Sequence, residues 1–286
     1  MLIKPNWIKI KLPTNLHNVR SVKKILRNKL LKTVCEEAQC PNLHECFNKG
    51  TATFMILGSI CTRKCPFCAV NKGQPKYLDK NEPKNLAKVI YDMNLNYVVI
   101  TSVNRDDLKD GGALHFSKCI KEIRKIKDIR IEILVPDFRK KEKIALELIS
   151  KNLPDIFNHN VENVPRLYKK IRPGASYKNS LNLLNIFNKK FPYIPTKSGL
   201  MVGLGEKKYE IFQVIKDLYD NGVSMLTIGQ YLQPSHLHVS VKKYLHKEEF
   251  QEIQDYAASI GFKHIFCGPL VRSSYHAFTQ YSKINI

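Results

Sequence analysis

The sequence has no long hydrophobic run. None of its segments approaches the roughly 18–20 uninterrupted apolar residues that a membrane-spanning helix requires. Residues 1–13, MLIKPNWIKIKLP, carry scattered lysines and two prolines, and they have no apolar core of signal-peptide length. These absences predict a cytoplasmic protein with no membrane partner.

Acidic residues are also scarce. The 25 Asp+Glu stand against 47 Lys+Arg, which gives a formal net charge of +22 and a pI near 9.6. A positive field of this size raises encounter rates with acidic partners, nucleic acids included. However, Lys, Asn and Ile are abundant throughout, and the charges are dispersed as on solvated surfaces. The charge therefore indicates a compositional bias, and no nucleic-acid partner is expected.

A complete dinucleotide fingerprint is missing as well. Gly203 and Gly205 in GLGE could begin one, but the third glycine that the motif needs is absent. The nine histidines include three near expected strand ends, which we interpret as packing or hydrogen-bonding residues: His159, His236 and His238. No catalytic acid or base is assigned.

The sequence does have a concentration of cysteine. Six of its eight cysteines lie between positions 35 and 68. In a reducing cytosol, such clusters bind metal or carry out redox chemistry more often than they form disulfides. The other two, Cys119 and Cys267, stand alone in apolar settings, which predicts ordinary core cysteines.

From residue 51 onward, short apolar or β-branched runs alternate with helix-compatible segments. The runs are expected strands at 51–58, 97–103, 129–136, 155–162, 199–205, 224–232 and 264–271. The expected helices lie at 83–94, 112–126, 141–152, 176–190, 207–222 and 247–261, and Gly222 and Gly261 mark two of their ends. This alternation predicts an α/β protein with βαβ crossovers and a parallel sheet, in the form of a full or partial (β/α) barrel. Its chemistry would lie on the loops that follow the strands.

A basic amphipathic helix is expected before this repeat, in the segment 18–35. Val22, Ile25, Leu26 and Leu30 form one stripe opposite lysines and arginines, and Asn18 is the expected N-cap. We expect the stripe to pack on the core rather than on a membrane surface.

The loop after the first expected strand carries three cysteines, spaced Cys-x3-Cys-x2-Cys: Cys61, Cys65 and Cys68. Three thiolates this close can hold three irons of a cubane cluster and leave the fourth iron without a protein ligand. A zinc knuckle would more often come as two Cys-x2-Cys pairs, and nothing nearby completes such a set. The spacing therefore predicts an iron–sulfur cluster with one open iron.

A second triplet, spaced Cys-x4-Cys-x5-Cys, precedes that loop: Cys35, Cys40 and Cys46. His44 is the local candidate for a fourth ligand, and it would complete a Cys3His set suited to structural zinc. The alternative is a second iron–sulfur cluster, because the two triplets follow each other so closely. The residues alone leave both readings open.

The spacing of Cys61, Cys65 and Cys68 after a strand resembles the radical S-adenosylmethionine superfamily. The resemblance implies that the open iron binds S-adenosylmethionine. It places Phe67 near the adenine, with simple loop packing as the alternative. It places the segment 106–113, DDLKDGGA, in the region that holds the methionine end.

The whole pattern is similar to the lipoyl synthases. Besides the two triplets, the matching segments are KPNWIKIKLP, NRDDLKDGGALHF, FNHNVENVPRLY, RPGASYKNSLNLL, KSGLMVGLGE, TIGQYLQPSHLHVSVKKY and RSSYHA. The resemblance implies a partial (β/α)6-type radical SAM barrel at 51–262. An N-terminal extension, 1–50, would carry the first triplet, and a C-terminal segment, 263–286, would carry RSSY.

The resemblance also implies two [4Fe–4S] clusters. One would be held by Cys61, Cys65 and Cys68. The other, an auxiliary cluster, would be held by Cys35, Cys40, Cys46 and, in place of His44, the second serine of RSSY, Ser274.

The implied reaction is sulfur insertion at C6 and C8 of a protein-bound octanoyl-lysine, with the auxiliary cluster as sulfur donor and S-adenosylmethionine consumed. The implied partners are octanoylated lipoyl domains of 2-oxoacid dehydrogenases, the glycine-cleavage carrier protein, a small redox protein as electron donor, and an iron–sulfur carrier that rebuilds the auxiliary cluster. One rival is another sulfur-inserting or methylthio-transferring radical enzyme, against which RSSY and the absence of an added RNA-binding domain count. The other is a zinc-stabilised nucleic-acid-binding protein that uses Cys35, Cys40, His44 and Cys46.

Overall fold

The computed structural model describes residues 2–10, 16–49, 51–126 and 128–282. The chain forms two compact units. The N-terminal unit comprises Ile10–Arg63 and Ala69–Ile156, and the C-terminal unit comprises Met1–Lys9, Lys64–Cys68 and Phe157–Ile286. Each unit is described by itself. The predicted division at residues 50 and 262 stays a prediction.

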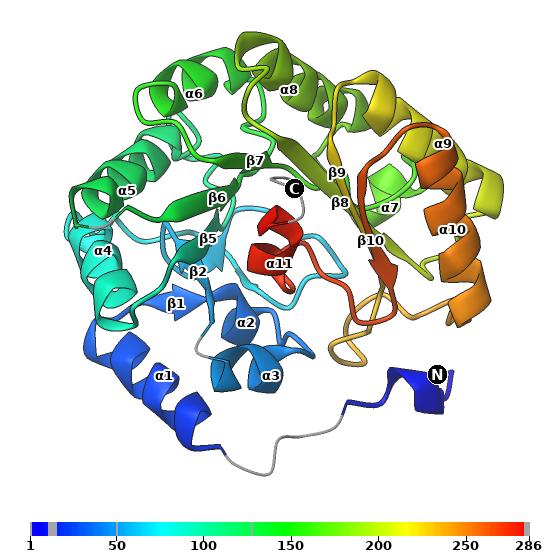
Figure 1. The fold of residues 1–286 in the computed structure, drawn as a ribbon, viewed down its shortest axis with the longest axis horizontal. Coiled ribbons are helices and arrows are strands. Elements are labelled where there is room, and N and C mark those ends of the chain that lie inside the picture. The colour runs from blue at the N-terminus through cyan, green and yellow to red at the C-terminus, as the bar shows by residue number, and fades with distance from the viewer. Residues whose placement is uncertain (1, 11–15, 50, 127, 283–286) are drawn as a thin grey trace. The chain divides into compact units, whose positions relative to one another are not determined.

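Parallel strands form the centre of the N-terminal unit. The strand order is β1-β2-β5-β6, where β1 (Lys32–Thr33) runs antiparallel to β2 (Thr53–Ile56). The strands β2, β5 (Tyr97–Ser102) and β6 (Arg130–Leu134) pair in parallel. Figure 1 shows α4 (Glu82–Asp92), α5 (Ala113–Ile126) and α6 (Glu142–Ile149) outside these strands. A parallel sheet requires such crossover helices, because its strands all point the same way.

Burial follows the apolar pattern of the sequence. The strands β5 and β6 contribute Val98, Val99, Ile100, Ile131 and Ile133 to the core, each at most 4% exposed. Burying such a side chain stabilises the fold by roughly 1.5–3 kcal/mol. Cys119 on α5 is fully buried, which confirms that it is a core cysteine.

Three helices precede β2 in the N-terminal unit: α1 (His17–Asn28), α2 (Val34–Glu37) and α3 (Leu43–Asn48). Two predictions about α1 are wrong. Asn18 lies inside the helix, and its Nδ2 donates to the Asn48 carbonyl 2.9 Å away, while Leu16 is the N-cap. Leu30 lies past the helix end, with φ +55° and 84% exposure, because the chain must turn there into β1. Val22 and Leu26 are buried as predicted, and Ile25 is partly buried.

The C-terminal unit repeats the alternation. Its strands pair in parallel in the order β7-β8-β9-β10, which are β7 (Ile156–Asn158), β8 (Thr196–Val202), β9 (Met225–Gln230) and β10 (His264–Gly268). The first residue of β7 belongs to the N-terminal unit. The long helices are α8 (Tyr177–Lys190), α9 (Lys208–Asp220) and α10 (Lys247–Ser259).

The remaining short elements of this unit are 3-10 or single-turn segments: η1 (Asn6–Ile8), η2 (Pro165–Leu167), α7 (Tyr168–Ile171) and α11 (Ala277–Ser282). Gly222 and Gly261 follow α9 and α10 with φ +79° and +113°, which confirms them as helix ends. Cys267 on β10 is partly exposed when the whole residue is considered. Its thiol is nevertheless shielded from water, and this desolvation raises the pKa of the thiol to about 12.

The expected α/β class and parallel pairing are confirmed in both units. The observed strands differ in extent from the expected ones, and two differences stand out. The strand expected at 155–162 is confined to β7, and the strand expected at 199–205 is β8, which begins at Thr196. In the described part of the chain, no helix has the length and apolar character needed to cross a membrane.

Candidate functional site

The cysteine-rich loop lies between two short strands that hold its ends together. These are β3 (Ile60–Cys61) and β4 (Asn71–Lys72), which pair in parallel, and the Gly73 N–H donates to the Cys61 carbonyl at 3.0 Å. Within the loop, the Cys68 N–H donates to the Cys65 carbonyl at 3.2 Å. Cys61, Cys65 and Cys68 are all partly exposed and form no disulfide. The loop therefore presents three reduced thiols.

Cys61 is surrounded by donors. The Arg63 N–H points to its Sγ at 3.4 Å, and the Asn104 Nδ2 donates to the same sulfur at 3.7 Å. Both the N–H and the hydroxyl of Thr62 donate to the Asn104 carbonyl, at 3.1 and 3.0 Å. The loop that follows β5 is thereby fixed against Cys61.

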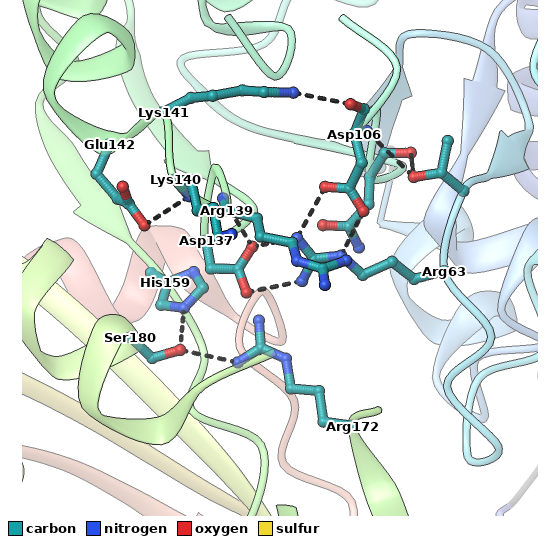
Figure 2. A network of polar contacts seen from close by, with 12 residues as sticks. Arg63, Asp106, Asp137, Arg139, Lys140, Lys141, Glu142, His159, Arg172 and Ser180 are labelled. Atoms are coloured by element: carbon teal, nitrogen blue, oxygen red, sulfur yellow. Dashed lines mark hydrogen bonds and ion pairs between the residues drawn. The ribbon is translucent and has the colours of Figure 1, made fainter. Parts of the chain in front are cut away.

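Arg63, between the first two cysteines of the loop, is bound by two carboxylates, those of Asp106 and Asp137 (Figure 2). It is 5% exposed and forms forked ion pairs with Asp106 and Asp137, at 2.8 Å to both oxygens of the first and 2.6–2.7 Å to those of the second. Burial opposes the charge of the guanidinium, but these hydrogen bonds outweigh it and raise the pKa of Arg63. Asp106 follows β5 and Asp137 follows β6, so one side chain joins the cysteine loop to two strand ends.

The loop after β5 is braced at other points as well. Lys141 Nζ donates to the carbonyls of Asp106 and Leu108, at 2.8 and 2.6 Å. Gly111 and Gly112 have φ +62° and +93°, and a Cβ on either would collide with Phe138 or Leu57. The glycines of DDLKDGGA thus permit close packing here, and the prediction that the segment lies near a methionine end stays a prediction.

The first triplet lies on one short helical hairpin of the N-terminal unit. Cys35 is buried in α2, Cys40 follows α2, and Cys46 is in α3. The Cys40 N–H donates to the Cys35 carbonyl at 3.0 Å, and the Cys46 N–H donates to the Asn42 carbonyl at 2.9 Å.

The three thiols of this hairpin lie close enough to affect one another. Desolvation and the neighbouring Cys40 and Cys46 raise the pKa of Cys35 to about 12, and desolvation, Cys40 and Glu45 raise that of Cys46 to about 11. A bound cation would reverse this repulsion, because it stabilises thiolates. No ready-made set of three or more His, Cys, Asp or Glu that could hold one metal ion occurs in the described ranges, so the fit rests on the chemistry of these thiols.

His44, the alternative fourth ligand, lies on α3 two residues before Cys46. Its Nδ1 is buried and has no hydrogen-bond partner among the residues described. The structure thus leaves this nitrogen available as a metal ligand.

The RSSY segment belongs to the C-terminal unit, whereas the first triplet belongs to the N-terminal unit. Its two serines differ. Ser273 exchanges hydrogen bonds with the Asn160 amide, accepting from Nδ2 at 2.8 Å and donating to Oδ1 at 2.9 Å. The Ser274 hydroxyl has no hydrogen-bond partner in the part of the chain that the structure describes.

A small cavity of about 80 Å³ lies beside Ser273, at the carboxyl ends of β7, β8 and β9, and its lining is mostly apolar. Asn160, Glu162, Thr227 and Arg272 line it. Burial raises the pKa of the Glu162 carboxyl, against the opposing effects of Arg172 and Asn160. The cavity therefore offers an amide, a hydroxyl and charged groups to a small polar ligand.

The three histidines expected to pack or form hydrogen bonds differ in burial and in their partners. His159 is fully buried, and its Nε2 is 3.0 Å from the Ser180 hydroxyl (Figure 2). His238 Nδ1 is 2.8 Å from the Ser235 hydroxyl, and His236 is exposed. The buried network continues from Ser180 to Arg172, whose Nη1 donates to that hydroxyl at 3.1 Å.

A β/α fold with a Cys-x3-Cys-x2-Cys loop after its first parallel strand defines a radical S-adenosylmethionine enzyme. In agreement, residues 55–218 match the sequence model described as the Radical SAM superfamily. The chain is 66% identical over 281 residues to the lipoyl synthase of Buchnera aphidicola subsp. Cinara cedri (strain Cc), a match that covers 98% of this chain and 91% of that protein. It is 62% identical over 283 residues to the lipoyl synthase of Histophilus somni (strain 2336), covering 99% and 88%. The chain belongs to the lipoyl synthase family.

Solved structures of lower identity show the same fold. SuiB of Streptococcus suis bound to S-adenosylmethionine superposes with a TM-score of 0.59 at 13% identity, covering 84% of this chain and 56% of that one. Methylornithine synthase gives a TM-score of 0.56 at 15% identity, covering 71% and 61%. These likenesses confirm the expected radical SAM β/α fold.

Proposed function

We propose that this chain inserts two sulfur atoms into an octanoyl chain held on a lysine of a carrier protein, at C6 and C8, and so forms a lipoyl group. The observation that carries the proposal is the identity of 66% over 98% of the chain with a lipoyl synthase. The two cysteine triplets and RSSY of this sequence agree with it. The enzyme is a sulfurtransferase of the radical SAM class, and its cofactors are two [4Fe–4S] clusters with S-adenosylmethionine as a consumed co-substrate.

The residues proposed to hold the first of these clusters are Cys61, Cys65 and Cys68. Those proposed for the auxiliary cluster are Cys35, Cys40, Cys46 and Ser274. When bound, the first cluster supplies the electron that cleaves S-adenosylmethionine to a 5′-deoxyadenosyl radical, and the auxiliary cluster supplies the sulfur. Both donor sets suit iron, because cysteine thiolates are its usual ligands in such clusters.

The two serines of RSSY support the assignment of Ser274. The Ser273 hydroxyl is already engaged on both sides by Asn160, whereas the Ser274 hydroxyl has no partner among the described residues. A serine oxygen is a harder ligand than a thiolate. The iron that it holds is therefore easier to detach, as a sulfur-donating cluster requires.

The protein's own side chains position groups and exclude water; none acts as an acid or base. We assign His159 to packing, because the Ser180 hydroxyl already holds its ring within the core.

The test of the function is anaerobic turnover. Protein purified without oxygen should be brown, should contain about eight irons per chain, and should show a reduced-cluster EPR signal that changes when S-adenosylmethionine is added. With an octanoylated lipoyl-domain peptide it should form about two 5′-deoxyadenosines per lipoyl group, one for each carbon that receives sulfur. A colourless zinc protein, or a methylthiolated nucleic acid as the product, would contradict the proposal.

We further propose a cytoplasmic location and the following partners: octanoylated lipoyl domains of 2-oxoacid dehydrogenases, the glycine-cleavage carrier protein, a small redox protein and an iron–sulfur carrier. The net charge of +22 supports acidic carriers. Opposite charge steers a partner to its site, and salt shortens the range of that attraction from about 10 Å at 0.1 M to about 3 Å at 1 M.

Carrier docking is therefore expected to depend on salt. The kcat/KM for a whole octanoylated lipoyl domain should fall about tenfold when salt is raised from about 0.05 to about 0.5 M. The matched control is a short neutral octanoyl-lysine peptide, for which the decline should be much smaller. If kcat/KM fell equally with salt for both substrates, electrostatic steering of the carrier would be contradicted.

A further inference from the structure

Asn104 has an unusual set of contacts for a partly buried side chain. It lies in the loop after β5, two residues beyond Ser102. Its Nδ2 donates to Cys61 Sγ at 3.7 Å, which is within range for a sulfur acceptor. Its Oδ1 is buried and has no partner among the described residues. The one side-chain hydrogen bond of this amide within the described part of the protein is thus directed at a proposed cluster ligand.

The backbone of Asn104 is fixed relative to Cys61. Its carbonyl accepts from both the N–H and the Oγ1 of Thr62, at 3.1 and 3.0 Å. Two residues further on, the Asp106 N–H donates to the same Thr62 hydroxyl at 3.2 Å. A side-chain replacement at position 104 leaves the carbonyl in place, so the bond to Cys61 can be removed without removing these contacts.

A second group is fixed on the same strand end. Arg63 binds both carboxylate oxygens of Asp106 at 2.8 Å, and the Arg63 N–H lies 3.4 Å from Cys61 Sγ. That N–H belongs to the backbone and persists in any variant of Asn104. The Asn104 amide is therefore the component of the donor set around Cys61 that a single substitution can change.

A donor aimed at a ligand sulfur has a predictable effect. It draws electron density from the thiolate, and it binds more strongly when the cluster is reduced and more negative. It therefore stabilises the reduced form. The potential of an iron–sulfur cluster rises with the number of hydrogen bonds to its sulfurs.

We propose that Asn104 is a positioning residue that raises the reduction potential of the cluster held by Cys61, Cys65 and Cys68, by donating Nδ2–H to Cys61 Sγ. The proposal rests on the proposed function, because it requires a cluster at those three cysteines. It assigns this side chain a role in electron uptake, and it makes the neutral amide at position 104 a determinant of how readily the cluster is reduced.

Two variants with side chains of similar size distinguish the effect of the Asn104 hydrogen-bond donor from the effect of side-chain shape. Asn104→Leu removes the donor, and Asn104→Asp replaces it with a negatively charged acceptor. EPR-monitored redox titration of the anaerobic holoenzyme should place the midpoint potentials in the order wild type, then leucine, then aspartate as the most negative. At a fixed solution potential, the ratio of reduced to oxidised cluster should fall about tenfold in the aspartate variant, which is about 59 mV for one electron.

The control for added charge is Asn81→Asp, on the exposed cap of α4 in the same unit, where the side chain makes no capping hydrogen bond. Its potential should match that of the wild type. Unchanged midpoint potentials in both Asn104 variants would overturn the proposal. If iron content and thermal stability also fell while the potential stayed unchanged, the amide would have a merely structural role. A wild-type protein with no cluster that responds to S-adenosylmethionine would instead overturn the proposed function.

Discussion

A Ser274→Ala variant is expected to lose lipoyl formation by at least about a hundredfold while still cleaving S-adenosylmethionine. Alanine cannot bind iron, so the auxiliary cluster would lack its fourth ligand, whereas Cys61, Cys65 and Cys68 would be untouched. The measurement is single-turnover product analysis by mass spectrometry, with iron content and 5′-deoxyadenosine determined on the same sample.

Three further variants make this result specific. Ser274→Cys should retain iron, because a thiolate replaces the alkoxide, and should release sulfur more slowly. Ser273→Ala removes the hydrogen bonds to Asn160, a change of about 1 kcal/mol in stability per bond, and should leave the iron content unaltered. His44→Ala tests the zinc reading. If the histidine variant loses metal and Ser274→Ala turns over normally, the ligand assignment is wrong.

Replacing Arg63 with methionine is expected to destabilise the protein by about 3–5 kcal/mol, because it removes the guanidinium that neutralises the buried carboxylate of Asp137. Asp137 is 2% exposed and is bound by two guanidinium nitrogens at 2.6–2.7 Å, so its carboxylate could not be rehydrated without opening the loop. The denaturant midpoint of the anaerobic protein measures the effect. Iron retention at the cysteine loop should fall in parallel, since Arg63 ties that loop to the ends of β5 and β6.

Matched variants distinguish geometry from charge. Arg63→Lys keeps the charge but cannot make a forked contact with two carboxylates, so an intermediate midpoint is expected. Combining Arg63→Met with Asp137→Asn should recover part of the loss, because the second change removes the stranded charge. A change below about 1 kcal/mol in Arg63→Met would mean that the ion pairs contribute no more than those on a surface.

The sequence predicted helices and strands well where the signal, such as periodicity or a capping residue, lies within the element itself. The helix α8 and its Ser176 cap, whose side chain accepts from the Asn179 N–H, agree with the expected helix at 176–190. The end of α1 was missed because it depends on a distant contact. The chain leaves the helix at Asn28 to pair β1 with β2, and the register of Lys32 with Met55 cannot be read from either segment.

The residues of the candidate site likewise fall into those that local sequence predicts and those that depend on distant contacts. The spacing of the two cysteine triplets indicated metal from the sequence, since ligands close in the chain need no knowledge of the fold. The sequence motifs assign no role to Arg63, although a charged residue between two cysteine ligands is a signal that was available. Its partners, Asp106 and Asp137, lie 43 and 74 residues away. Asn104 begins one of the segments that resemble the lipoyl synthases, but nothing in the sequence indicated that its side chain would contact Cys61.

The sequence by itself determined the alternation of strands and helices, the two sets of thiols and the family, because periodicity, ligand spacing and identity are properties of the linear chain. Only the tertiary structure decided which groups surround those thiols. The guanidinium of Arg63 and the amide of Asn104 become partners of the cysteine loop because parallel pairing of β2, β5 and β6 brings the carboxyl ends of these strands to one edge. Hydrogen bonds act over about 3 Å, so contacts of this kind depend on folding and not on distance along the chain.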